Sequence, residues 1–140
     1  MERQKQGLAW NERFNIGHSL VDGQHQRLFE MISELASYCE DGSDAEKLQQ
    51  TLDYLVDYTV RHFNEEEELQ TKYGYPDYIK HKALHEEFKV SVGELVSEFK
   101  ESGSSAELSR GVNKVLVRWI VKHVIDEDKK IGVFIREASV

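Results

Sequence analysis

Apolar residues recur every three or four positions along most of this 140-residue chain, which is the period of an α-helix that buries one face. Four long segments carry such a stripe, at about residues 19–40, 43–73, 77–100 and 104–129. Short polar or glycine-containing segments separate them, and no alternating pattern indicates a strand. The sequence therefore predicts an all-α fold, an up-down-up-down antiparallel four-helix bundle.

Start and stop signals stand at the ends of the predicted helices. Asp41-Gly42 follows the first stripe, and Gly74-Tyr75-Pro76 separates the second from the third. Glycine permits a helix C-cap, and proline readily begins the next element. Ser43-x-x-Glu46 and Ser104-x-x-Glu107 match the capping box that opens a helix, and Ser19-x-x-Asp22 is a looser version.

The two ends of the chain fall outside the four stripes. Residues 1–18 are predicted to form an N-terminal arm, whose large apolar residues are spaced too irregularly for a helix and are expected to cover the core. The tail 131–140 is predicted to form another short helix, with Gly132 as a candidate joint. We therefore expect one domain, residues 19–140, preceded by the arm.

Composition excludes several classes of function. The net charge of −8 and the pI of about 5.2 argue against a general nucleic-acid binder and against a polybasic membrane contact. No apolar run approaches the ~20 residues that cross a bilayer, and residues 1–7 lack the apolar core of a signal peptide. We expect a cytoplasmic protein. Cys39 is the only cysteine, which excludes an internal disulfide and a cysteine-based metal site.

Five of the six histidines stand on the apolar stripes, and each of the four helices contributes at least one. They are His25, His62, His81, His85 and His123. A lone histidine on an apolar face is usually a core residue with a hydrogen-bond partner. Five such imidazoles in one bundle would be difficult to satisfy without a metal, and bundle cores bind metals through inward side chains from facing helices. His18 is read as a surface residue.

Two carboxylates complete this candidate metal site. Glu66 follows His62 by four residues and so shares its helix face. Asp128 follows His123 by five, which is a rotation of about 140° on an ideal helix. Either the helix loosens there, or Asp128 reaches round to a metal displaced from His123. The other three acids of the run 65–68 are expected to form a solvated face.

Seven ligands exceed what one ion accepts and suit two six-coordinate transition-metal ions. Zinc prefers four ligands, and magnesium and calcium prefer oxygen, whereas imidazole with carboxylate suits iron. Two bridging carboxylates would supply four bonds, the imidazoles five and a bridging hydroxide two. One position of two octahedral ions would then stay open for a small ligand.

The order and spacing of these residues resemble the hemerythrin family, in its single-domain bacterial form. The matching motifs are Asp22-Gly23-Gln24-His25, His62-x-x-x-Glu66, His81-x-x-x-His85 and His123-x-x-x-x-Asp128. They extend the resemblance over nearly the whole chain, from Trp10 to Asp128. Leu69 and Gln70 stand where many relatives have a methionine, and we expect no effect on the metals.

The resemblance implies a di-iron centre, with a bridging oxo or hydroxo group, that binds dioxygen reversibly. One iron would be held by His81, His85 and His123, and the other, with the open position, by His25 and His62. Glu66 and Asp128 would bridge them. Apolar residues beside the ligands would line the oxygen pocket and keep it dry. These pocket residues are Leu28, Phe63, Trp119, Ile120 and Val124.

The function implied is that of a binding protein, an oxygen carrier, store or delivery module, and not of an enzyme. Di-iron oxidases and peroxidases of the ferritin-like kind use Glu-x-x-His, which this sequence lacks; Asp22-x-x-His25 is the nearest match. Slow oxidase chemistry and oxygen or redox sensing are the alternatives, although sensing relatives usually carry a fused signalling domain. The sequence does not separate storage from delivery to an oxygen-consuming enzyme.

Overall fold

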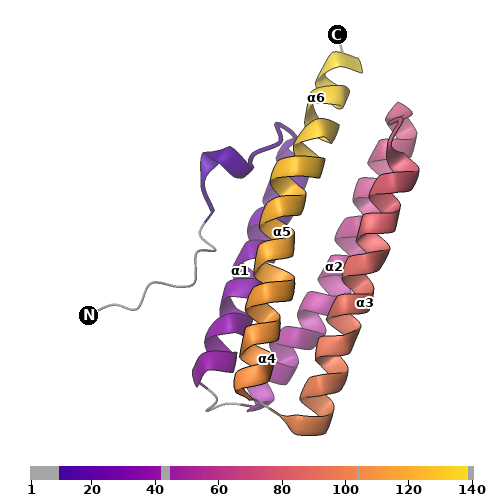
Figure 1. Cartoon of the computed structure of the whole chain (residues 1–140). Coiled ribbons are helices and arrows are strands. Elements are labelled where there is room, and N and C mark those ends of the chain that lie inside the picture. Colours follow the sequence, from indigo (N-terminus) through magenta and orange to yellow (C-terminus); the bar gives the residue numbers. More distant parts are fainter. Residues whose placement is uncertain (1–9, 42–44, 104, 139–140) are drawn as a thin grey trace.

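Four long helical rods lie side by side in the structure, a computed structural model that describes residues 10–41, 45–103 and 105–138 (Figure 1). The first three rods are α1 (Ser19–Asp41), α2 (Ala45–Tyr73) and α3 (Tyr78–Ser102). The fourth is continuous and consists of α4 (Ala106–Gly111), η2 (Val112–Val117), α5 (Arg118–His123), η3 (Val124–Asp128) and α6 (Lys129–Ala138). Successive rods run in opposite directions, which confirms the predicted four-helix bundle.

Helix boundaries agree with the sequence in the first three rods, where they lie within two residues of the predicted positions. The fourth rod differs. Ser105 caps it by accepting a hydrogen bond from the N–H of Leu108 at 3.0 Å, whereas the predicted caps Ser43 and Ser104 lie outside the described residues. The predicted joint at Gly132 is wrong, because α6 continues the same rod through this residue.

Gly132 is instead a point of close approach between α6 and the N-terminal segment. A Cβ atom at this position would overlap the carbonyl oxygen of Ile16. Ile16 and Phe14 are buried, as expected of apolar residues that cover the core. Asp22 holds this segment in place, because its carboxylate accepts hydrogen bonds from the N–H groups of Ile16 (2.7 Å) and Gly17 (3.2 Å).

The described residues form two apolar cores inside the bundle, and a polar layer lies between them. Along α2 the main core includes Phe63, and the smaller core is contacted by Leu69, with buried Glu66 between the two. Along the fourth rod, Val124 belongs to the main core, Ile131 to the smaller one, and buried Asp128 lies between. Burying ionisable groups between two apolar cores is costly unless they have partners, so this layer is the place to look for chemistry.

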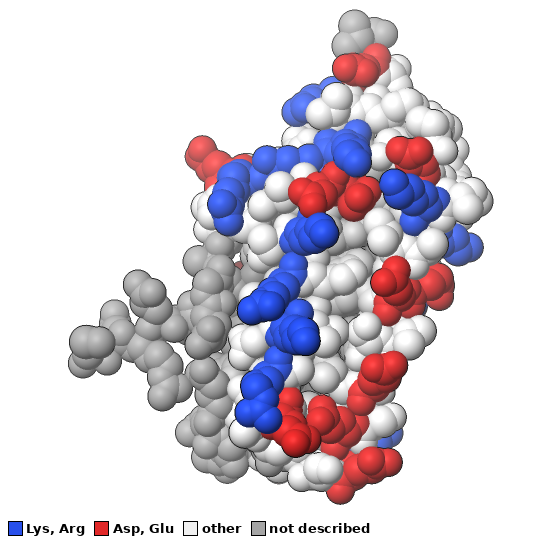
Figure 2. Space-filling model, in the orientation of Figure 1, with Lys and Arg blue, Asp and Glu red and all other residues white. Residues whose placement is uncertain are grey.

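The outer faces of the rods are charged. Figure 2 shows Lys and Arg in a line along one side of the visible face and Asp and Glu along another, as expected of solvated helix faces. Among the described residues, no helix has a stretch long and apolar enough to cross a membrane.

Candidate metal centre

All five stripe histidines and both candidate carboxylates are buried in the polar layer, and none is more than 4% exposed. The four rods contribute to it in chain order: His25 from α1, His62 and Glu66 from α2, His81 and His85 from α3, and His123 and Asp128 from the fourth rod. The structure thus brings all seven predicted residues together. His18 lies outside the layer at the start of α1, where its Nδ1 accepts a hydrogen bond from the N–H of Val21 (3.4 Å).

A π-helical segment, η3, explains the five-residue spacing between His123 and Asp128. A π-helix closes its hydrogen bonds from residue i to i+5, so residues five apart lie on one face. The Nε2 atom of His123 accordingly lies 3.1 Å from Oδ1 of Asp128. Of the two alternatives that the sequence left open, the structure adopts the loosened helix.

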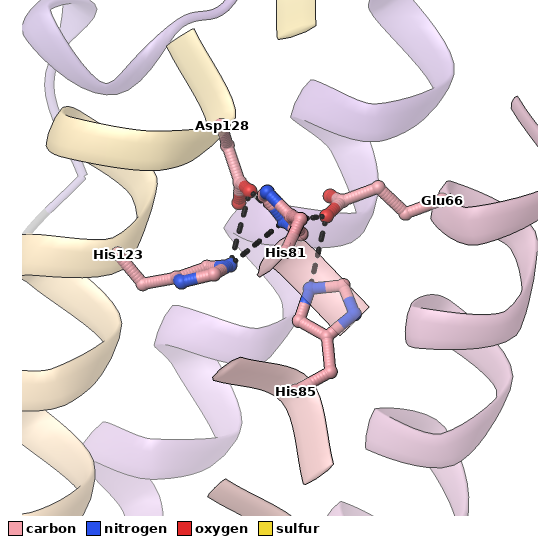
Figure 3. A group of neighbouring side chains, drawn as sticks. All are labelled: Glu66, His81, His85, His123 and Asp128. Atoms are coloured by element: carbon pink, nitrogen blue, oxygen red, sulfur yellow. Dashed lines mark hydrogen bonds and ion pairs between the residues drawn. The ribbon is translucent and has the colours of Figure 1, made fainter. Parts of the chain in front are cut away.

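The seven side chains form two overlapping groups, in each of which the candidate ligand atoms lie within 4.8 Å of one another. One group, drawn in Figure 3, contains Glu66, His81, His85, His123 and Asp128. The other contains His25, His62, Glu66 and Asp128. The two carboxylates are therefore shared, and three imidazoles lie on one side of them and two on the other.

Glu66 turns one oxygen toward each group. Its Oε1 atom lies 2.9 Å from Nε2 of His81 and 3.1 Å from Nε2 of His85. Its Oε2 atom lies 3.3 Å from Nε2 of His62 and 3.5 Å from Nε2 of His25. A carboxylate with its two oxygens divided in this way can bridge two metal ions.

The two carboxylate oxygens of Asp128 also face different groups of imidazoles. Its Oδ1 atom lies 3.0 Å from Nε2 of His81 and 3.1 Å from Nε2 of His123. Its Oδ2 atom lies 3.0 Å from Nε2 of His25. Both carboxylates therefore lie between the same two sets of imidazoles.

The donor atoms of the layer fit metal ions better than they fit one another. Several buried atoms have no hydrogen bond to any described residue, despite a polar neighbour nearby: Nε2 of His25, Nε2 of His85, Oε2 of Glu66 and Oδ1 of Asp128. Neighbouring ligands of an octahedral ion with bonds of ~2.1 Å lie roughly 3 Å apart, close to the contacts observed here. Imidazole nitrogen together with carboxylate oxygen is a donor set that suits iron.

Without a metal, protons balance the charges of the layer. Burial lowers the pKa of His25, but the carboxylates of Asp128 and Glu66 outweigh it and raise this pKa to about 9. The same balance raises the pKa of His81 to about 10. Burial raises the pKa of both carboxyl groups, yet the surrounding imidazoles hold it well below its usual range. At His62 burial dominates and lowers the pKa.

Two further side chains orient the imidazoles from behind. The Nδ1 atom of His62 lies 2.7 Å from Oε1 of Gln24, and Nδ1 of His85 lies 2.9 Å from Oε2 of Glu67. Such hydrogen bonds fix the tautomer and direction of a metal-binding histidine. The expectation that Glu67 is solvated is wrong, because it is only 8% exposed. Its position four residues after Phe63, which was expected in the oxygen pocket, was the available signal.

Aromatic rings pack directly on the imidazoles. Phe63 stacks on His85 with ring centroids 3.8 Å apart, and Trp119 stacks on His123 at 4.2 Å. Phe63 is buried in the main core, and Trp119 is partly buried against it. The other residues expected to line an oxygen pocket are also buried there: Leu28, Ile120 and Val124.

A four-helix bundle whose rods all contribute to one buried imidazole–carboxylate cluster defines a metal-binding class of bundle protein. A family model described as the hemerythrin HHE cation binding domain matches residues 17–134. The chain therefore belongs to the hemerythrin family.

Individual relatives agree with this assignment. The bacteriohemerythrin of Stenotrophomonas maltophilia is 33% identical over 122 residues, which cover 87% of this chain and 77% of that protein. The bacteriohemerythrin of Methylococcus capsulatus is 32% identical, covering 89% of this chain and 94% of its own. The crystal structure of wild-type hemerythrin superposes with a TM-score of 0.77 at 29% identity, covering 89% of this chain and 95% of that one.

Proposed function

We propose that this chain binds dioxygen reversibly at a centre of two iron ions and serves as an oxygen carrier, store or delivery protein. The observation that supports this most is the pair of buried imidazole groups that share two divided carboxylates. Membership of the hemerythrin family, whose known property is oxygen binding, supports it further. We also propose that residues 19–140 act as the single domain, preceded by the arm 1–18.

Each residue of the layer has a role in this proposal. One ion would be held by His81, His85 and His123, the other by His25 and His62, and both by Glu66 and Asp128. When bound, the two ions supply reversible redox chemistry toward dioxygen. Because the second ion has one imidazole fewer, its side of the layer is where dioxygen would enter. The buried apolar residues around the layer would exclude water from this position.

A binding protein is favoured over an enzyme because the layer lacks the Glu-x-x-His pairs of ferritin-like oxidases and is closed by apolar side chains on both sides. Sensing of oxygen or redox state uses the same residues and would differ only in what responds to the bound state. An oxygen-consuming enzyme is the partner that a delivery role would require.

The visible absorption spectrum of protein loaded anaerobically with Fe²⁺, cycled between oxygen and argon, tests the proposal. We expect a charge-transfer band that appears with oxygen and fades under argon. His81→Ala should abolish the band, whereas His18→Ala, outside the layer, should leave it unchanged. An irreversible change to a ferric spectrum would favour sensing or oxidase chemistry, and the absence of any iron spectrum would overturn the assignment.

A further inference from the structure

Gln70 is a buried polar residue that the proposed function does not use. Its side chain is 0% exposed, and neither the nitrogen nor the oxygen of its amide has a hydrogen-bond partner among the residues that the structure describes. A buried amide without partners is costly, and such residues are rare in folded proteins. Gln70 follows Glu66 by four residues on α2 and therefore lies on the face that carries the metal layer.

The hairpin of α2 and α3 places Gln70 level with His81. Glu66 contacts both His81 and His85 across this antiparallel pair. Gln70 lies one turn beyond Glu66 on α2, and His81 lies one turn before His85 on α3. Both steps lead toward the loop that connects the two helices, so Gln70 and His81 lie at the same height in the bundle. The N–H of Tyr75 donates to the carbonyl oxygen of Gln70 (2.9 Å), which fixes the backbone at this end.

His81 has a nitrogen that needs an acceptor at this level. Its Nε2 atom points into the layer, 2.9 Å from Glu66 and 3.0 Å from Asp128. With a metal on Nε2, the Nδ1 atom carries the hydrogen, and this buried atom has no partner within the described part of the chain. The two other histidines of α2 and α3 have such an acceptor, from Gln24 and Glu67. His81 is the one of the three that lacks it.

We propose that Gln70 is a positioning residue for His81. In the metal-loaded protein its amide oxygen accepts the hydrogen bond from Nδ1–H of His81, directly or through one buried water. This bond satisfies two orphaned groups at once and fixes the imidazole as Gln24 and Glu67 fix theirs. The inference rests on the proposed binding of metal by the layer, but not on dioxygen. It replaces the expectation that position 70 has no influence on the metals.

The test compares metal affinity with the stability of the metal-free protein in Gln70→Met, a substitution of similar volume. We expect Fe²⁺ affinity, measured anaerobically against a chelator, to fall by about 10–100-fold. The urea midpoint of the metal-free variant should stay equal or rise, because a buried amide without partners is removed. Gln24→Met should lower the affinity similarly, and Gln50→Met, at an exposed position of α2, should not.

A spectroscopic signature separates positioning from packing. In Zn²⁺-loaded protein, the Nδ1–H signal of His81 in ¹⁵N NMR should be protected from exchange, and Gln70→Met should remove the protection while His85 keeps it. An unchanged affinity with an unchanged His81 signal would overturn the proposal, and so would a parallel loss of affinity and stability. Because Zn²⁺ replaces iron and no oxygen is used, this arm stands even if the oxygen-binding proposal fails.

Discussion

His123 and Asp128 face the same way from one continuous helix although they are five positions apart. An ideal α-helix would turn them about 140° apart. The π-helical segment η3 removes this difference and brings Nε2 of His123 to 3.1 Å from Oδ1 of Asp128. The same segment sets the rotation of α6, whose residues Ile131 and Ile135 are buried in the smaller core.

Inserting one alanine after Asp126, an exposed residue of η3, should therefore destabilise the protein. The π-helical segment already accommodates one residue more than a regular α-helix would, so a second extra residue shifts α6 and rotates Ile131 and Ile135 by about 100° away from their core. We expect urea unfolding of the metal-free protein to show a loss of about 2–5 kcal/mol. Asp126→Ala keeps the chain length and should change stability by less than about 0.5 kcal/mol. An insertion variant as stable as wild type would show that η3 does not set this register.

Glu67 should matter for metal binding although it is not a candidate ligand. Its hydrogen bond to Nδ1 of His85 is lost in Glu67→Leu, so the imidazole is free to turn. We expect an affinity for Fe²⁺ lower by about 10–100-fold in anaerobic chelator competition. Glu68→Leu removes the exposed neighbouring charge and is the matched control. Equal affinities in the two variants would contradict a role for this hydrogen bond.

Helical periodicity was sufficient to predict the four rods and six of the seven buried residues of the layer, whereas it placed Asp128 away from the face of His123. Each histidine stands on the apolar stripe of its own helix, so burying the stripes brings the imidazoles together. Glu66 could be placed because it is four residues from His62. The division of the carboxylate oxygens between two groups agrees with the bridging role expected of Glu66 and Asp128, whereas the pairing of each oxygen with particular imidazoles could not be predicted, because it depends on side-chain rotation in the packed bundle.

Features that depend on contacts with a distant part of the chain could not be predicted from the sequence. Glu67 belongs to a run of four acids, and only its contact with α3 distinguishes it from the exposed Glu65 and Glu68. A glycine at position 132 suggested a joint between two helices, whereas the structure requires glycine there because the backbone of Ile16 lies too close for a Cβ atom. The spacing of residues 123 and 128 indicated either a loosened helix or a metal displaced from His123, and the sequence alone did not distinguish the two.

The stability of the metal-free protein should fall as pH rises above neutrality. The ordinary histidine pKa is 6.5, and in the folded state it is about 9 for His25 and about 10 for His81. The folded protein thus binds more protons than the unfolded chain in this window. His62, with a lowered pKa, is neutral in both states there, and the carboxylates of Glu66 and Asp128 stay ionised.

The expected slope is a loss of up to about 2.7 kcal/mol per pH unit while both imidazoles contribute. Below the unfolded pKa the stabilisation is fully present, and it disappears as pH passes the two folded values. Urea midpoints measured between about pH 6 and pH 9 check this, and Zn²⁺ loading should flatten the curve because the metal replaces the protons. If stability stayed constant or rose over this range, His25 and His81 would not be protonated in the folded metal-free protein.

Two glycine-to-alanine substitutions should change the free energy of unfolding in opposite directions. Gly132→Ala places a Cβ against the carbonyl oxygen of Ile16 and should destabilise by about 1–3 kcal/mol as the N-terminal segment is pushed away. At Gly93, inside α3, a Cβ would meet no atom of residues 10–41, 45–103 and 105–138 within 4 Å. Gly93→Ala should therefore stabilise by about 0.5–1 kcal/mol through helix propensity. Urea unfolding measures both, and a neutral Gly132→Ala would refute the close approach.

Polar substitutions in the proposed oxygen pocket should make the oxygen-dependent absorption of the iron-loaded protein decay faster. Leu28 and Ile120 are each 1% exposed, so Leu28→Ser or Ile120→Glu would admit water and protons to the layer. We expect the oxygen-dependent absorption of iron-loaded protein to decay several-fold faster in air. Leu20→Ser, at a 58% exposed position of the same helix as Leu28, is the matched control. If both pocket variants bind two irons and decay at the wild-type rate, dryness of this pocket does not protect the bound oxygen.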